Sequence, residues 1–168
     1  SQVFGDDSLV EINRNNIHQD SSNIYLLNSD GDYGTALRGV AVIPKDNITN
    51  PTTYPQSSTD FNIDPYKTLQ IVSETEAYLI HNSNSRSVCK ADLSDGSIIS
   101  VGQDKDDVAP SADQGVALTK ITISEDGYIY AISRDEYLYR IDMNDLSVVY
   151  VGQLSGVGRV GYIVAATF

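Results

Sequence analysis

Oxygen-bearing side chains alternate along one short segment near the N-terminus. Asn28, Asp30 and Asp32 stand at every second position, and Gly31 and Gly34 allow a tight loop between them. Amide and carboxylate oxygens are the ligands that calcium prefers. The segment departs from the EF-hand pattern, since no glycine follows Asp32 and no glutamate closes the loop. It predicts either a calcium site completed from elsewhere in the chain or an ordinary polar turn.

Residues for other kinds of chemistry are few and scattered. His18 and His81 are the only histidines, and neither has a His, Cys or Glu neighbour at metal-binding spacing. The single cysteine, Cys89, lies in a predicted strand, where a small buried side chain is expected. A nucleophile with a base at a recognisable spacing is missing as well. These observations favour a non-enzymatic protein.

Two segments are candidates for a ligand-binding surface. The stretch 45–67 holds three prolines and no sustained period, so we expect a long loop, with Tyr54 and Tyr66 available to contact a glycan. The acidic connector around Asp104 is the other candidate, although a solvated turn also explains it. A lectin-like or adhesive module, with or without calcium, is therefore one of two functional hypotheses.

Composition limits the class of partner. The 168 residues include 11 basic and 23 acidic side chains, a net charge of −12. Binding to nucleic acid needs clustered Lys and Arg, so it is not expected. A membrane span is not expected either, because no apolar run approaches the roughly 20 residues required. The acidic composition, and a first residue Ser1 without a signal peptide, favour a secreted or cell-surface protein, although a trimmed chain would begin the same way.

The elements that would position these side chains are strands. The stretch 116–154 predicts four of them, each rich in β-branched and aromatic residues and joined by polar turns. Tyr137, Tyr139 and Ile141 alternate along one of these strands, so one face can be buried and the other wet. The sequence therefore predicts an all-β fold built from four-stranded antiparallel meanders.

A second stretch repeats the first. Residues 68–103 match 116–154, with Tyr78 recurring as Tyr128 and Gly102 as Gly152, a displacement of 50 positions without a gap. A fixed period of this size is the signature of repeated structural units. The predicted organisation is one domain, 1–168, with a split repeat from 1–28 and 155–168, a strand and long loop at 36–67, and repeats at 68–103 and 116–154.

The run GYIYAISRDEYLYRIDMNDLSVVYVGQ, residues 127–153, resembles a blade of the β-propeller repeat proteins. The resemblance implies a radial or stacked set of four-stranded sheets, with a terminal blade built from both chain ends. Three meanders are fewer than the four to eight blades typical of propellers. Two chains forming one ring, a degenerate blade hidden in 36–66, a longer parent protein, or pairing between neighbouring subunits would each account for the difference.

The two ends of the chain carry the second functional hypothesis. Each end is predicted to hold half a meander, and a half-sheet leaves unpaired backbone groups that can pair with another copy. This predicts a self-assembling structural protein, such as a filament, surface-layer or appendage subunit. The residues expected at the assembling strands are Leu9, Val10, Ile12, Tyr162, Ile163, Val164 and Phe168.

Overall fold

The computed structural model describes residues 17–19, 21–28, 39–55, 69–73, 75–81 and 83–154, which form three four-stranded antiparallel sheets. The N-terminal sheet consists of β1 (Ile17–Gln19), β2 (Asn23–Asn28), β3 (Gly39–Pro44) and β4 (Thr52–Pro55). The middle sheet consists of β5 (Leu69–Ser73), β6 (Glu76–Ile80), β7 (Val88–Asp92) and β8 (Ser97–Val101). The C-terminal sheet consists of β9 (Leu118–Ile123), β10 (Tyr128–Ser133), β11 (Tyr137–Asp142) and β12 (Val148–Gln153).

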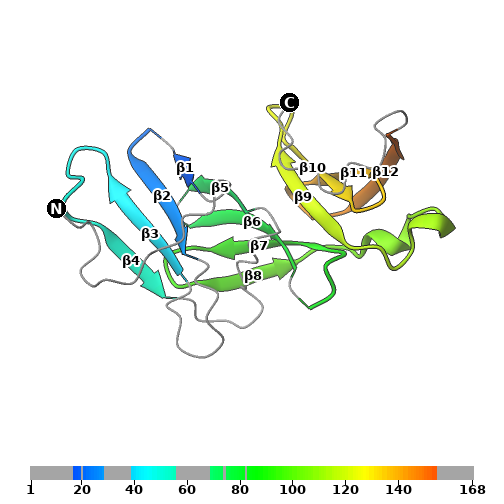
Figure 1. Ribbon diagram of the computed structural model, residues 1–168, viewed down its shortest axis with the longest axis horizontal. Helices are drawn as coiled ribbons and strands as arrows, with labels where there is room; N and C mark the ends of the chain where they lie inside the picture. The colour runs from blue at the N-terminus through cyan, green and yellow to red at the C-terminus, as the bar shows by residue number, and fades with distance from the viewer. Residues whose placement is uncertain are drawn as a thin grey trace.

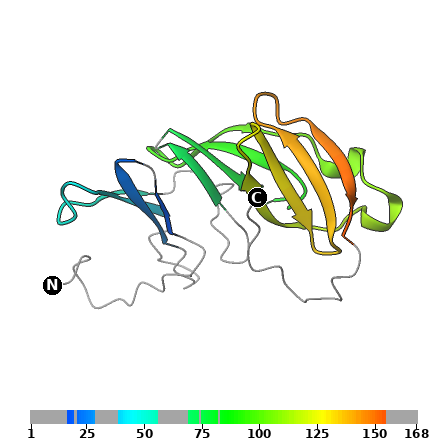
Figure 2. The ribbon, with the colours of Figure 1, turned by 90° about the horizontal axis from the view of Figure 1, so that it is seen from above.

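Each sheet is a simple meander in which consecutive strands are neighbours (Figure 1). The three sheets follow one another across the molecule (Figure 2): β1 contacts β5, and β9 contacts both β5 and β6. Two short 3-10 helices, η1 (Lys105–Asp107) and η2 (Ser111–Asp113), lie in the connector between the middle and C-terminal sheets. The predicted all-β meander architecture is confirmed.

The same turn chemistry joins the third and fourth strands of the middle and C-terminal sheets. Asp92 Oδ1 accepts a hydrogen bond from the Ser94 N–H at 2.8 Å, and Asp142 Oδ1 accepts one from the Asn144 N–H, also at 2.8 Å. Aspartate favours such turns because its side chain bonds the backbone two residues on. The turn of the middle sheet then uses Gly96 at φ 69°. In the C-terminal sheet Leu146 occupies that position at φ 57°, a conformation that costs a non-glycine residue about 1 kcal/mol or more.

The middle and C-terminal sheets are repeats of each other, but the number of positions that separates equivalent residues differs from strand to strand. Tyr78 pairs with Lys90, and the matching pair in the C-terminal sheet is Tyr130 with Arg140. The third strands are therefore displaced by 50 positions and the second strands by 52, so the structural equivalent of Tyr78 is Tyr130 and not Tyr128. The predicted ungapped match is wrong there, because the connection between the last paired residues of the second and third strands, Ile80 and Val88, is two residues longer than the equivalent connection between Ile132 and Leu138.

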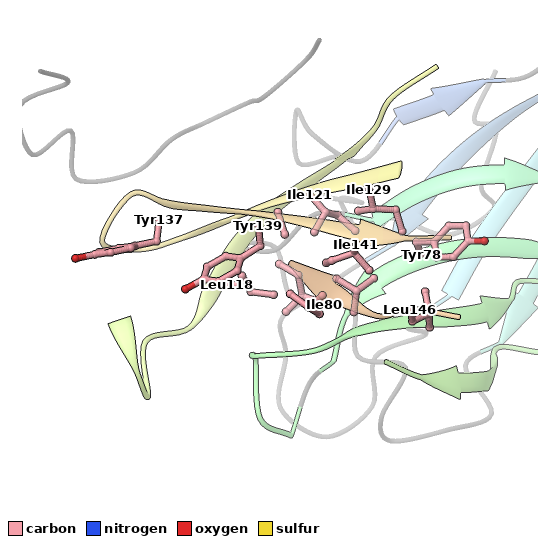
Figure 3. Close-up of a cluster of buried hydrophobic side chains, with 12 residues drawn as sticks. Tyr78, Ile80, Leu118, Ile121, Ile129, Tyr137, Tyr139, Ile141 and Leu146 are labelled. Carbon is pink, nitrogen blue, oxygen red and sulfur yellow. The ribbon is translucent and has the colours of Figure 1, made fainter. Parts of the chain in front are cut away.

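The core consists of two apolar layers, one on each face of the middle sheet. The first layer joins Tyr25 and Val42 of the N-terminal sheet to residues of the middle sheet such as Leu79. The second joins the opposite face of the middle sheet to the C-terminal sheet, and its largest side chains are seen in Figure 3. They include Tyr78, Ile80, Leu118, Ile121, Ile129, Tyr137, Tyr139, Ile141 and Leu146.

The N-terminal segment differs from the prediction in two ways. Residues 22–27 were expected to form the last strand of a split meander, but β2 is the second strand of its own sheet, paired with β1 and β3. The stretch 45–67 was expected to be a loop throughout, yet β4 lies within it and pairs with β3. Residues 161–168, expected to complete the split meander, lie outside the described residues.

Candidate functional site

A buried ion pair lies in the connector between the middle and C-terminal sheets. Lys105 begins η1 and Asp113 ends η2, and both side chains have no exposed surface. The Lys105 ammonium nitrogen lies 3.0 Å from Asp113 Oδ2, 2.7 Å from the Asp113 carbonyl oxygen and 2.8 Å from Asp106 Oδ1. A lysine ammonium has three hydrogens to donate, so these three acceptors satisfy it.

The C-terminal sheet supplies the remaining partners of the Asp113 carboxylate. Ser133 donates its hydroxyl to Oδ1 at 2.7 Å, and the buried Tyr139 hydroxyl donates to Oδ2. Burial, and then this bond to the carboxylate, raise the pKa of Tyr139 well above its ordinary value. Tyr139 therefore stays protonated as a donor at any physiological pH. The Lys105 ammonium also lies 5.3 Å from the centre of the Tyr139 ring, within range of a cation–π interaction.

A more exposed layer ties the connector to the middle sheet. The Arg86 guanidinium lies 3.0 Å from Asp104 and 3.4 Å from Asp106. Asp106 also accepts the Gly115 N–H at 2.7 Å. Burial opposes ionisation of Asp106, yet hydrogen bonds from Lys105 and Gly115 outweigh it and lower the pKa of this carboxyl.

We call Lys105, Asp106, Asp113, Ser133 and Tyr139 the connector clamp. Its central groups are buried and are already paired with one another, so the arrangement holds the connector against the C-terminal sheet. A group that binds a substrate must be exposed to it, and the side chains of Lys105 and Asp113 are both fully buried. The connector clamp therefore acts to fix how the middle and C-terminal sheets are joined.

A second contact between the sheets is made by the turn that follows β11. Leu146 is 3% exposed, and its Cβ lies 2.7 Å from where a side chain would begin at Gly102. The Gln103 N–H donates to the Leu146 carbonyl oxygen at 3.1 Å, and the Gln103 side-chain oxygen accepts the Val148 N–H at 3.0 Å. Gly102 and Gln103 thus form a socket for the turn of the next sheet.

The second strand of each sheet carries a tyrosine at an equivalent position. The burial of this tyrosine shows how well its face of the sheet is covered by a neighbouring sheet. Tyr25 and Tyr78 are fully buried, and each faces the sheet that follows. Their equivalent in the C-terminal sheet, Tyr130, is only partly buried. On the adjacent edge strand β12, Val149 and Val151 are 49% and 51% exposed. Their equivalents in the middle sheet, Ile99 and Val101, are as exposed, at 53% and 52%. The partial exposure of Tyr130 is therefore what distinguishes this face of the C-terminal sheet from the covered faces at Tyr25 and Tyr78.

Most of the predicted site residues lie outside the described part of the chain. Tyr54 is in β4 and Asn28 ends β2, but their side chains are not among those described. The others fall in undescribed segments: Leu9, Val10, Ile12, Asp30, Asp32, Tyr66, Tyr162, Ile163, Val164 and Phe168. Within the described ranges, no three His, Cys, Asp or Glu side chains are grouped to hold a metal ion. The calcium, glycan and terminal-strand predictions stay predictions.

Sequence reasoning placed Asp104 and Asp106 in a solvated acidic turn and missed Lys105 and Asp113. The signal that could have found the pair was the lone lysine in an otherwise acidic connector, since a basic side chain among carboxylates usually pairs with one of them.

Neither a protein-family model nor a curated protein matches this chain. In the part that the structure describes, none of the helical segments has the length and apolar character to cross a membrane.

Proposed function

We propose that the chain is a non-enzymatic structural protein that assembles with copies of itself outside the cell, as a filament, surface-layer or appendage subunit. The observation that carries the proposal is the contrast between Tyr78, fully buried beneath the following sheet, and its equivalent Tyr130, which is partly exposed. A tyrosine that is partly exposed at a repeat position where its equivalents lie beneath the next sheet favours a further sheet as the partner.

The order of the sheets supports a propeller-like assembly. The first strands β1, β5 and β9 contact one another in succession, and β6 also contacts β9, so each sheet packs against the next as propeller blades do around an axis. A chain with three described sheets would reach the usual range of four to eight blades once a second copy is added. The terminal strands predicted from the sequence, around Leu9 and Tyr162, remain the other route by which copies could join.

Solution mass tests the proposal directly. We expect light scattering to give a mass of at least two copies for the full chain, with rings or filaments in negative-stain images of the same sample. A variant lacking residues 161–168 separates the two routes: assembly through terminal strands is lost in it, whereas its circular dichroism spectrum should remain that of a folded β protein. A single-copy mass at every concentration would overturn the proposal.

A further inference from the structure

The socket formed by Gly102 and Gln103 recurs at the end of the C-terminal sheet. Gly152 and Gln153 stand 50 positions later, after the fourth strand of the equivalent unit. At Gly102 an added Cβ would lie 2.7 Å from Leu146, but at Gly152 it would meet no atom within 4 Å. The side chain of Gln153 is exposed. Among the residues that the structure describes, none fills this second socket.

The N-terminal sheet carries the residue that matches such a socket. Leu146, which fills the first socket, is the fourth residue after β11, and Ile48 is the fourth residue after β3. Both therefore stand at the same count from the third strand. The turn of Ile48, residues 45–51, is two residues longer than the turn of Leu146, residues 143–147, and it is closed by a bond from the Asn47 N–H to the Pro44 carbonyl oxygen. Leu146 is 3% exposed, whereas Ile48 is 62% exposed, the highest value among the exposed large apolar residues of the described chain.

We propose that the Ile48 turn of one copy docks at Gly152 and Gln153 of a second copy, as Leu146 docks at Gly102 and Gln103 within the chain. The inference rests on the proposed self-assembly and names its contact surfaces. A second copy is the partner because the described part of this chain carries both a socket that nothing fills and an exposed apolar side chain between the third and fourth strands of another sheet. Since the two surfaces differ, the contact is head-to-tail.

The interface is continuous with one that the structure already contains. The junction of the middle and C-terminal sheets combines the Leu146 turn with the buried Tyr78 face. On the C-terminal sheet the second socket follows β12 of the same sheet, whose equivalent face carries the partly buried Tyr130. The second copy would thus place its N-terminal sheet over the C-terminal sheet in the position that the C-terminal sheet takes over the middle one.

Three variants test the docking. Ile48→Asp places a charge on the turn, and Gly152→Leu fills the socket; the backbone at Gly152 is not in the left-handed region, and the space around it is open, so the fold should tolerate the leucine. Ile99→Asp is the matched control, because Ile99 is 53% exposed on the fourth strand of the middle sheet, away from both surfaces. The chains are produced in a bacterial host, since Asn47 begins a glycosylation sequon.

We expect light scattering to give a single-copy mass for Ile48→Asp and for Gly152→Leu, at a concentration where the unmodified chain and Ile99→Asp assemble. Mixing the two defective variants should restore a mass of two copies, because one retains the socket and the other retains the turn. If the unmodified chain assembles and both variants assemble equally well, this docking is wrong while self-assembly stands. A single-copy unmodified chain would overturn both.

Discussion

The ammonium nitrogen of Lys105 lies 3.0 Å from Oδ2 of Asp113, and neither side chain has any exposed surface. A buried pair of this kind costs desolvation energy, so it adds little net stability compared with an apolar pair of similar shape. Removing one partner lowers stability strongly, because the other charge is then left in a poorly solvated site. We infer that the pair serves to specify the path of the connector, and with it how the C-terminal sheet follows the middle sheet.

Replacing Asp113 with asparagine should lower the free energy of unfolding by about 3 kcal/mol, because Lys105 loses its buried counter-ion. Chemical denaturation in urea measures the loss. Asp107→Asn is the control, since Asp107 is exposed in η1, the 3-10 helix that Lys105 begins, and its effect should stay within about 0.5 kcal/mol. Equal effects of the two substitutions would contradict the clamp.

Alanine should lower stability at Gly102 but leave it unchanged at the equivalent residue Gly152. At Gly102 the new Cβ would lie 2.7 Å from Leu146 Cβ and 2.8 Å from the Val88 carbonyl oxygen, so we expect Gly102→Ala to lower stability by about 1 to 3 kcal/mol. At Gly152 nothing lies within 4 Å, and Gly152→Ala should be neutral within about 0.5 kcal/mol in the single chain. Thermal unfolding of both variants provides the comparison. A neutral Gly102→Ala would show that the turn after β11 yields easily, and that the socket is not closely packed.

Alternation and turn chemistry were enough to locate the strands of the middle and C-terminal sheets, because both signals are local. Strand β4 was missed since Pro51 and Pro55 suggested a loop. The trio Thr52, Thr53 and Tyr54 between them favours a strand, and the position of β4 at the sheet edge tolerates proline.

The candidate site was harder to predict than the strands. Lys105 and Asp113 lie in a polar connector without apolar periodicity, and their partner Tyr139 is 26 residues beyond Asp113. Their burial depends on the docking of one sheet against another, which no local pattern encodes. The displacement of 52 positions between the second strands was also missed. The turn residues that match best in the sequence follow the third strands, which are displaced by 50 positions.

Glu76 should make a pH-dependent contribution to stability. Its carboxylate accepts hydrogen bonds from the Tyr78 hydroxyl and, at 3.0 Å, from the Lys90 ammonium, and these bonds lower its pKa below the ordinary value of 4.5. A carboxyl whose pKa is lower in the folded state binds protons less readily there than in the unfolded chain. Its contribution is therefore complete above about pH 4.5 and is lost as the pH falls through the lowered pKa of the folded state.

The matching experiment compares Glu76→Gln with the unmodified chain by urea denaturation at pH 7 and at pH 3. Both partners are about one-third exposed, which limits the expected loss at pH 7 to about 1 kcal/mol. At pH 3 the gap should narrow, because Glu76 of the unfolded chain is then largely protonated and part of the advantage of the lowered pKa in the folded state is lost. Glu125→Gln, at the exposed turn between β9 and β10, serves as the control and should leave stability at pH 7 unchanged within about 0.5 kcal/mol. A gap that stays constant between the two pH values would mean that the Tyr78 and Lys90 bonds do not depend on the charge of Glu76.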